Sequence, residues 1–192
     1  KSCILLAALF APGVTTVTEL RPTRDHTERL LRRMGIAVRT EGLTVRLEGV
    51  GASGPDWTDR EWAVPGDFSS AAFWITAAAC RPGSAVEIRG VGLNPRRTAL
   101  IGVLRRMGAA IEVQEECDGA FCEAAGTIRV QGARLRGTRV LEAEVPDMID
   151  ELPLVAMAGA QAEGVTEITG AAELRVKECD RIDSVAAGLR AM

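Results

Sequence analysis

Aromatic residues are scarce in this sequence, and its net charge is small. Phe and Trp together make up 4% of the 192 residues, Tyr is absent, and the net charge is −3. Proteins that bind nucleic acid present clustered positive charge and often aromatic platforms for the bases, so we expect no nucleic-acid partner. No apolar run reaches the length of a membrane-spanning helix, so we expect no membrane partner either.

Cysteine and histidine are also few. The five Cys and the single His26 are scattered along the chain. An odd number of dispersed Cys in a chain of this size is typical of a reducing compartment, and we expect a cytoplasmic protein. Cys117 and Cys122 lie close together, but His26 is distant in sequence, so two free thiols in a loop are favoured over a metal site.

An order of elements repeats along the chain. Each repeat opens with an Ala-rich apolar helix, passes through a Gly turn into a short β-type run, and enters an amphipathic helix. The first helices are predicted at 2–10, 69–80 and 150–161, the β runs at 13–20, 83–88 and 164–168, and the second helices at 25–34, 97–107 and 180–192. Two of the second helices end in Arg-Met-Gly, where Gly35 and Gly108 are typical of a C-terminal cap.

Pairs of alternating strands separate the repeats. The predicted pairs are 36–39 with 43–47, joined by the turn TEG, and 110–113 with 127–130, joined by the cysteine loop. With a further strand expected before the first helix, each unit reads β-α-β-α-β-β. Repetition at roughly 70–80 residues predicts an α/β fold with α+β character. The first unit lacks a leading strand and the third lacks a final hairpin, so we expect both chain ends to lie inside units. The internal boundary is predicted at Pro65 and Gly66.

Residues 175–181, with the sequence RVKECDR, place cations and carboxylates together before a predicted helix. An ammonium, a carboxylate and a guanidinium at such close spacing can bind an anion and move a proton at one spot.

This segment resembles the RVKESDR signature of the EPSP synthase (5-enolpyruvylshikimate-3-phosphate synthase) family. Six further segments resemble that family in the expected order: KSCILLA at 1–7, TRDHTE at 23–28, VPGDFSSAAF at 64–73, GLNPRRT at 92–98, MIDELP at 148–153 and AELR at 172–175. The resemblance implies two similar domains of three β-α-β-α-β-β units each, with helices inside and sheets outside, an inside-out α/β barrel. Residues 1–64 then resemble the last unit of one domain, and residues 65–192 the first one and a half units of the second, with the family's hinge near the boundary.

The resemblance also implies a reaction. The 5-hydroxyl of shikimate 3-phosphate attacks carbon 2 of phosphoenolpyruvate, and the tetrahedral intermediate collapses with loss of phosphate. No metal or organic cofactor is implied. Both substrates are polyanions, so the site requires cations, and carboxylates to move protons. We expect the full-length enzyme to be a monomer.

Asp150 has two interpretations that can coexist. At the start of an apolar helix, Asp is a typical N-cap, and the helix N-terminus would keep the carboxylate ionised. The match to the family motif implies instead that Asp150 is the general base at the substrate hydroxyl, and also contacts shikimate 3-phosphate.

The 175–181 motif supplies the other implied residues. Lys177, otherwise an ordinary surface lysine, is implied to bind shikimate 3-phosphate beside Asp150 and to take part in catalysis. Glu178, otherwise helix-start charge, is implied to transfer a proton at the methylene carbon of phosphoenolpyruvate. Arg181, which on spacing alone would pair with Glu178, is implied to clamp phosphoenolpyruvate. Arg175 and Asp180 are expected to hold these residues in place.

Two predicted helix starts have similar double interpretations. Thr23 or Asp25 is a natural N-cap, with Glu28 completing a capping box from Asp25. The resemblance implies that Thr23 and Arg24 contact shikimate 3-phosphate. Asp67 before the apolar run is expected to be an N-cap rather than part of an anion site.

The chain departs from the family pattern at some points. Glu173 stands where some relatives have a substrate-contacting Asn, and Cys179 stands where Ser or Thr is commoner. Several cations and a Gly-rich loop of the family site would lie before Lys1 or after Met192. Each lost charge-assisted contact to an anion costs about 1.5–3 kcal/mol, so we expect these 192 residues alone to be inactive.

Two alternatives remain open on the sequence. One is enolpyruvyl transfer to UDP-N-acetylglucosamine, although that family lacks the 175–181 motif and uses a reactive Cys in another loop. The other is a non-catalytic fragment that keeps only the fold.

Overall fold

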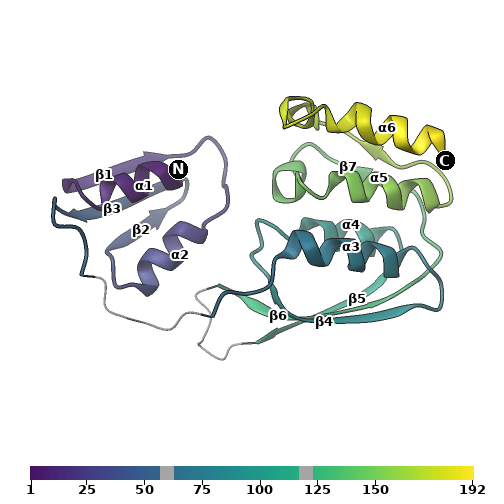
Figure 1. Ribbon diagram of the computed structural model, residues 1–192, viewed down its shortest axis with the longest axis horizontal. Coiled ribbons are helices and arrows are strands. Elements are labelled where there is room, and N and C mark those ends of the chain that lie inside the picture. The colour runs from purple at the N-terminus through teal and green to yellow at the C-terminus, as the bar shows by residue number, and fades with distance from the viewer. Residues whose placement is uncertain (57–62, 117–122) are drawn as a thin grey trace. The chain divides into compact units, whose positions relative to one another are not determined.

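The computed structural model describes residues 1–56, 63–116 and 123–192 (Figure 1). They group into two compact units, one containing Lys1–Val64 and the other almost all residues from Pro65 onward. In the described part of the chain, no helix is both long and apolar enough to cross a membrane. The cysteine loop between Cys117 and Cys122 lies outside the described residues, so the interpretation of its thiols stays a prediction.

The first unit places two helices on a three-stranded antiparallel sheet. Its elements are α1 (Ser2–Ala8), β1 (Pro12–Thr18), α2 (His26–Arg33), β2 (Val38–Glu41) and β3 (Thr44–Val50), and the strand order is β1-β3-β2. Leu5 and Leu9 from the first helical segment, Leu31 from α2 and Leu47 from β3 form its buried core. The predicted α-β-α-β-β order is confirmed here.

The second unit opens with the same order of elements. It comprises α3 (Phe68–Ala79), β4 (Ala85–Gly92), α4 (Ala99–Arg106), β5 (Ala110–Glu116) and β6 (Ala125–Gln131), with antiparallel strand order β4-β6-β5. Figure 1 shows α3 and α4 along one face of this sheet. Ile75, Leu100, Leu104 and Ile128 are fully buried between these elements.

The second compact unit, which begins at Pro65, also contains the third sequence repeat. Its elements are β7 (Arg139–Val140), the 3-10 helix η1 (Val145–Met148), α5 (Leu152–Gln161), β8 (Glu167–Ile168), the 3-10 helix η2 (Ala172–Val176) and α6 (Arg181–Ala191). Strands β7 and β8 are parallel on either side of α5 in the chain, so β7 is the expected leading strand. In the second repeat, Gly66 makes the corresponding parallel bridge, to Val91. The two 3-10 helices were not predicted.

Local sequence signals explain where several elements end. The Asp67 carboxylate accepts hydrogen bonds from the backbone N–H groups of Ser69 and Ser70 and caps α3, as expected. Gly35 and Gly108 follow α2 and α4 with positive φ angles of 84° and 110°, which confirms the predicted C-terminal caps.

A repeated close approach also links the two three-stranded sheets to their first helices. A Cβ at Gly49 would lie 2.1 Å from the carbonyl oxygen of Ala11, and a Cβ at Gly132 would lie 1.9 Å from that of Arg81. Both glycines let the end of a strand pass against the chain that leaves the first helix of the repeat. The equivalence supports the repeat independently of helix and strand periodicity.

Candidate active site

Asp150 lies in the turn between η1 and α5. The N-cap of α5 is Glu151, whose carbonyl oxygen accepts hydrogen bonds from the N–H groups of Leu154 and Val155 at 2.9 and 3.2 Å. The expectation that Asp150 caps this helix is therefore wrong. Pro153 explains the late start, because a residue without an N–H is best accommodated in the first helical turn.

Arg181, the first residue of α6, joins two of the predicted site carboxylates. Its Nη1 donates to Oδ1 of Asp150 at 3.2 Å, while its Nε and Nη2 donate to the two oxygens of Glu178 at 2.9 and 3.0 Å. The hydrogen bonds from Arg181 hold the pKa of Glu178 below its ordinary value, so the carboxylate is ionised at neutral pH. The pairing expected from the spacing of Glu178 and Arg181 is confirmed.

Lys177 leaves η2 in an extended conformation and forms an ion pair with Glu173. The distance from its Nζ to Glu173 Oε1 is 3.1 Å, and about a quarter of the lysine side chain is exposed. Glu173 therefore holds the ammonium that the family resemblance assigns to substrate. The expected proximity of Lys177 to Asp150 stays a prediction.

Arg175 and Asp180 brace the segment between η2 and α6. Arg175 Nη1 donates to Asp180 at 2.7 Å and to Asp183 at 3.1 Å, and the other oxygen of Asp180 accepts the N–H of Asp183 at 3.0 Å. The backbone hydrogen bond from Asp183 and, against desolvation, the Arg175 guanidinium lower the pKa of Asp180. These contacts fit the expected supporting role, because they fix the start of α6 and hence the base of Arg181.

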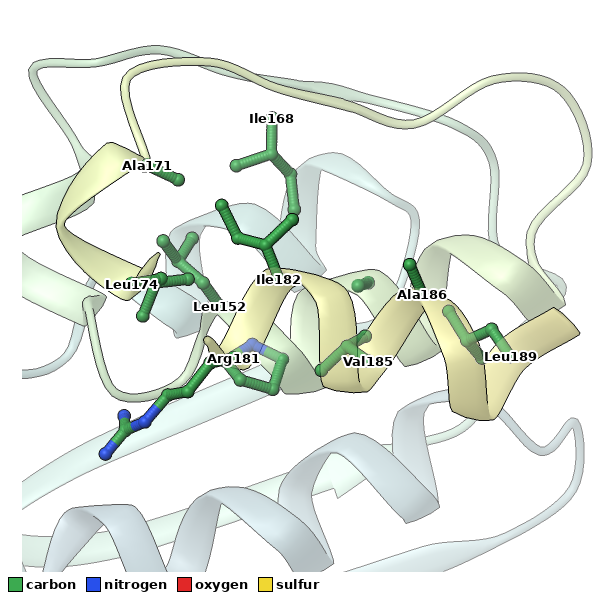
Figure 2. Close-up of a pocket in the computed structure, with 11 residues that line it drawn as sticks. Leu152, Ile168, Ala171, Leu174, Arg181, Ile182, Val185, Ala186 and Leu189 are labelled. Atoms are coloured by element: carbon green, nitrogen blue, oxygen red, sulfur yellow. The ribbon is translucent and has the colours of Figure 1, made fainter. Parts of the chain in front are cut away.

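An apolar pocket lies beside Arg181, between α5 and α6 (Figure 2). Its volume is about 250 Å³, and its lining includes Leu152, Leu174, Ile182 and Val185. Figure 2 shows the guanidinium of Arg181 directed away from these side chains. The aliphatic stem of Arg181 thus lines an apolar surface while its charged end reaches the carboxylates.

In the first unit, Thr23 and Arg24 precede α2, whose N-cap is Asp25. Asp25 makes no side-chain capping hydrogen bond and pairs instead with Arg29 at 2.9 Å. The expected capping box does not form, because the buried Glu28 carboxylate pairs with the Lys1 ammonium at 2.7 Å. A charge-assisted contact of this kind is stronger than a bond to a neutral backbone N–H.

Lys1 also connects this cluster to Thr23. Its Nζ donates to Glu19 at 2.9 Å, and the Thr23 hydroxyl donates to the other oxygen of the same carboxylate. Partial burial alone would lower the pKa of Lys1, but the hydrogen bonds to Glu28 and Glu19 outweigh it and raise that pKa. The sequence does not predict this network, since nothing local to residue 1 indicates partners 18 and 27 positions away.

A family model described as EPSP synthase (3-phosphoshikimate 1-carboxyvinyltransferase) matches residues 1–192. The chain belongs to the EPSP synthase family. It is 50% identical, over all 192 residues, to 3-phosphoshikimate 1-carboxyvinyltransferases of Xanthomonas euvesicatoria pv. vesicatoria and Thermus thermophilus. It spans 42% and 44% of the lengths of these relatives.

Solved structures support the EPSP synthase fold. An EPSP synthase from Acinetobacter baumannii matches 98% of this chain with a TM-score of 0.88 and 47% identity, over 42% of its own length. The enolpyruvyl transferase NikO from Streptomyces tendae matches 85% of this chain and 37% of its own, with a TM-score of 0.63 and 22% identity, which supports the fold alone. The α/β fold of the enolpyruvyl transferases is thereby confirmed.

In this EPSP synthase family member, the second unit brings together Asp150, Glu178 and Arg181. Thr23 and Arg24 belong to the first unit. The described residues contain no group of three or more His, Cys, Asp or Glu side chains arranged to hold a metal ion. Cys179, within the 175–181 motif, is an exposed free thiol, and its sulfur accepts a long hydrogen bond from the Ser184 hydroxyl at 3.9 Å.

Proposed function

We propose that this chain is part of an enzyme that transfers the enolpyruvyl group from phosphoenolpyruvate to the 5-hydroxyl of shikimate 3-phosphate. The hydroxyl oxygen forms a bond to carbon 2 of phosphoenolpyruvate while the methylene carbon gains a proton. The tetrahedral intermediate then loses phosphate and a methyl proton, which restores the double bond. The reaction needs a base at the hydroxyl, a proton carrier at the methylene carbon and cations for two polyanions.

The candidate residues supply the base, the proton carrier and the cations that this reaction needs. Asp150 accepts the proton of the hydroxyl. Glu178, which is ionised before the substrates bind, takes a proton from water and passes it to the methylene carbon, and it takes back the methyl proton when phosphate leaves. Arg181 binds the carboxylate or phosphate of phosphoenolpyruvate through its planar fork. Lys177, with Thr23 and Arg24, binds shikimate 3-phosphate. None of these proposed roles requires a bound cofactor.

One observation carries the proposal: the guanidinium of Arg181 lies between the carboxylates of Asp150 and Glu178. A cation that adjoins both proposed proton carriers would place a bound anion within reach of each. The side chains of Arg181 and Asp150 are 24% and 32% exposed, so a ligand can approach them from solvent.

We further propose the domain assignment that the repeats suggest. Residues 1–64 form the last repeat of one enolpyruvyl transferase domain, and residues 65–192 form the first one and a half repeats of the other. The order of elements in each unit supports this assignment. Since the chain spans less than half the length of its relatives, the 192 residues alone should not turn over.

A full-length chimera tests the function. In this chimera, the present chain replaces the aligned 192 residues of the Thermus thermophilus relative, and phosphate release is measured with both substrates. We expect turnover that requires both, product detected by mass spectrometry, and no turnover by the 192-residue chain. A folded chimera without turnover would favour the non-catalytic alternative, and transfer to UDP-N-acetylglucosamine would favour the other one. Circular dichroism and gel filtration against the unmodified relative establish folding.

A further inference from the structure

A buried polar junction lies next to Asp150 and has no role in the proposed chemistry. Arg97 Nη2 donates to the Ser69 hydroxyl at 2.6 Å, and that hydroxyl donates to Glu151 Oε1 at 2.5 Å. Arg97 Nη2 also lies 3.9 Å from the same carboxylate oxygen. The junction joins the first turn of α3, the loop between β4 and α4, and the turn between η1 and α5.

A gain in the stability of the fold does not explain this junction. The Glu151 side chain is 1% exposed and that of Arg97 is 18% exposed. Within the described residues, Glu151 Oε2 and Arg97 Nε are buried without a hydrogen-bond partner. Burying a carboxylate with one oxygen unsatisfied is costly, and replacing a buried ion pair by apolar side chains is often neutral or stabilising. Because stability does not account for this junction, the geometry that it enforces next to Asp150 is the better explanation.

The junction constrains the chain at the residue that follows Asp150. Glu151 is the adjacent residue, and its carboxylate is held by Ser69 while that of Asp150 contacts Arg181 of α6. The backbone of Glu151 is held as well, because its N–H donates to the carbonyl of Met148 and its carbonyl starts α5. Two consecutive carboxylates are thus anchored to different parts of the same unit.

We infer that Glu151, held by Ser69 and Arg97, is a positioning residue that fixes the carboxylate of Asp150 for proton abstraction. This inference rests on the proposed function. A general base must lie within hydrogen-bond reach of the proton that it takes, and a misplacement of about 1 Å can reduce a rate by roughly a hundredfold. The junction would supply that constraint from a side chain that does not touch the substrate.

Steady-state kinetics of the full-length chimera test the inference. For Glu151→Ala we expect kcat to fall roughly 10- to 100-fold, with KM for both substrates within about twofold. Glu151→Gln keeps an oxygen that can accept from Ser69 and should recover most of the lost kcat. Glu87→Ala removes another ion-paired carboxylate, which contacts Arg129 at 2.6 Å on the sheet, and should leave kcat within about twofold.

Ser69→Ala provides a second test if Glu151→Ala does not fold, because it removes only the bridging hydroxyl. We expect kcat to fall roughly tenfold, and a crystal structure should show the carboxylate of Asp150 displaced from Arg181. An unchanged kcat in folded Ser69→Ala or Glu151→Ala would overturn the inference. If Asp150→Asn abolishes turnover while these variants keep full kcat, only the positioning role fails. If Asp150→Asn also has no effect, the proposed base fails with it.

Discussion

Arg181 Nη1 lies 3.2 Å from Oδ1 of Asp150, so residues 31 positions apart in the chain meet at one point. The same guanidinium is held by both oxygens of Glu178. The proposed anion-binding cation is therefore already paired with carboxylates. An incoming substrate anion must share this guanidinium or replace one of its partners, and the more exposed Glu178 is the easier partner to replace.

Arg181→Lys in the chimera should weaken phosphoenolpyruvate binding. A lysine cannot present the planar fork, so at least one charge-assisted hydrogen bond is lost, worth about 1.5–3 kcal/mol or roughly 10- to 100-fold in KM. Arg175→Lys is the matched control, since Arg175 pairs with Asp180 and Asp183 and should change KM by less than about twofold. Equal effects of the two substitutions on KM would contradict the role given to Arg181.

The cap of α3 should contribute stability that depends on pH. Burial alone would raise the pKa of Asp67, but hydrogen bonds from Ser70 and Ser69 lower it below its ordinary value of 3.8. A carboxyl group whose pKa is lower in the folded state stabilises the fold above its unfolded-state pKa, and loses that contribution as pH falls through the folded-state pKa.

Asp67→Ala should therefore reduce the free energy of unfolding by about 1 kcal/mol at neutral pH. The difference from the unmodified chain should shrink below pH 3.8. Denaturant titrations at several pH values measure both. Asp67→Ser keeps a capping oxygen without a carboxyl group, so it should be more stable than Asp67→Ala, and the difference between these two variants should not change with pH. A difference for Asp67→Ala that is constant down to about pH 2 would contradict the account.

The close approach at Gly132 should make that position intolerant of a side chain. A Cβ there would lie 1.9 Å from the Arg81 carbonyl oxygen and 2.4 Å from that of Ala78. Gly132→Ala should destabilise the chain by about 1–3 kcal/mol in thermal or denaturant unfolding.

Gly102→Ala is the matched control for this prediction. Gly102 is exposed within α4, and a Cβ there would lie more than 4 Å from any described atom beyond the adjacent turns of the helix. The same substitution should stabilise the chain by about 0.5–1 kcal/mol, because Ala restricts the unfolded chain and favours helix. A neutral Gly132→Ala would show that the strand end can move away from the helix.

The sequence predicted the elements of this fold well, because their signals are local. Each predicted helix begins within two residues of its observed start. The caps at Asp67, Gly35 and Gly108 depend on residues only a few positions apart. The two 3-10 helices were missed, since short helical turns carry no apolar periodicity.

The contacts within the candidate site were less predictable. The pairs that join Arg181 to Asp150, Lys1 to Glu28, and Arg97 through Ser69 to Glu151 are set by packing between distant segments. Asp150 was misplaced as a cap because Pro153 shifts the helix start. The proposed roles of Lys177, Thr23 and Arg24 follow from family motifs.

Asp150→Asn in the full-length chimera tests the central claim most directly. The change keeps the size of the side chain and removes the base, so turnover with both substrates should fall by roughly 10²- to 10⁴-fold. The circular dichroism spectrum and unfolding midpoint should remain close to those of the unmodified chimera. A folded Asp150→Asn variant that turns over at the unmodified rate would contradict the proposed active site.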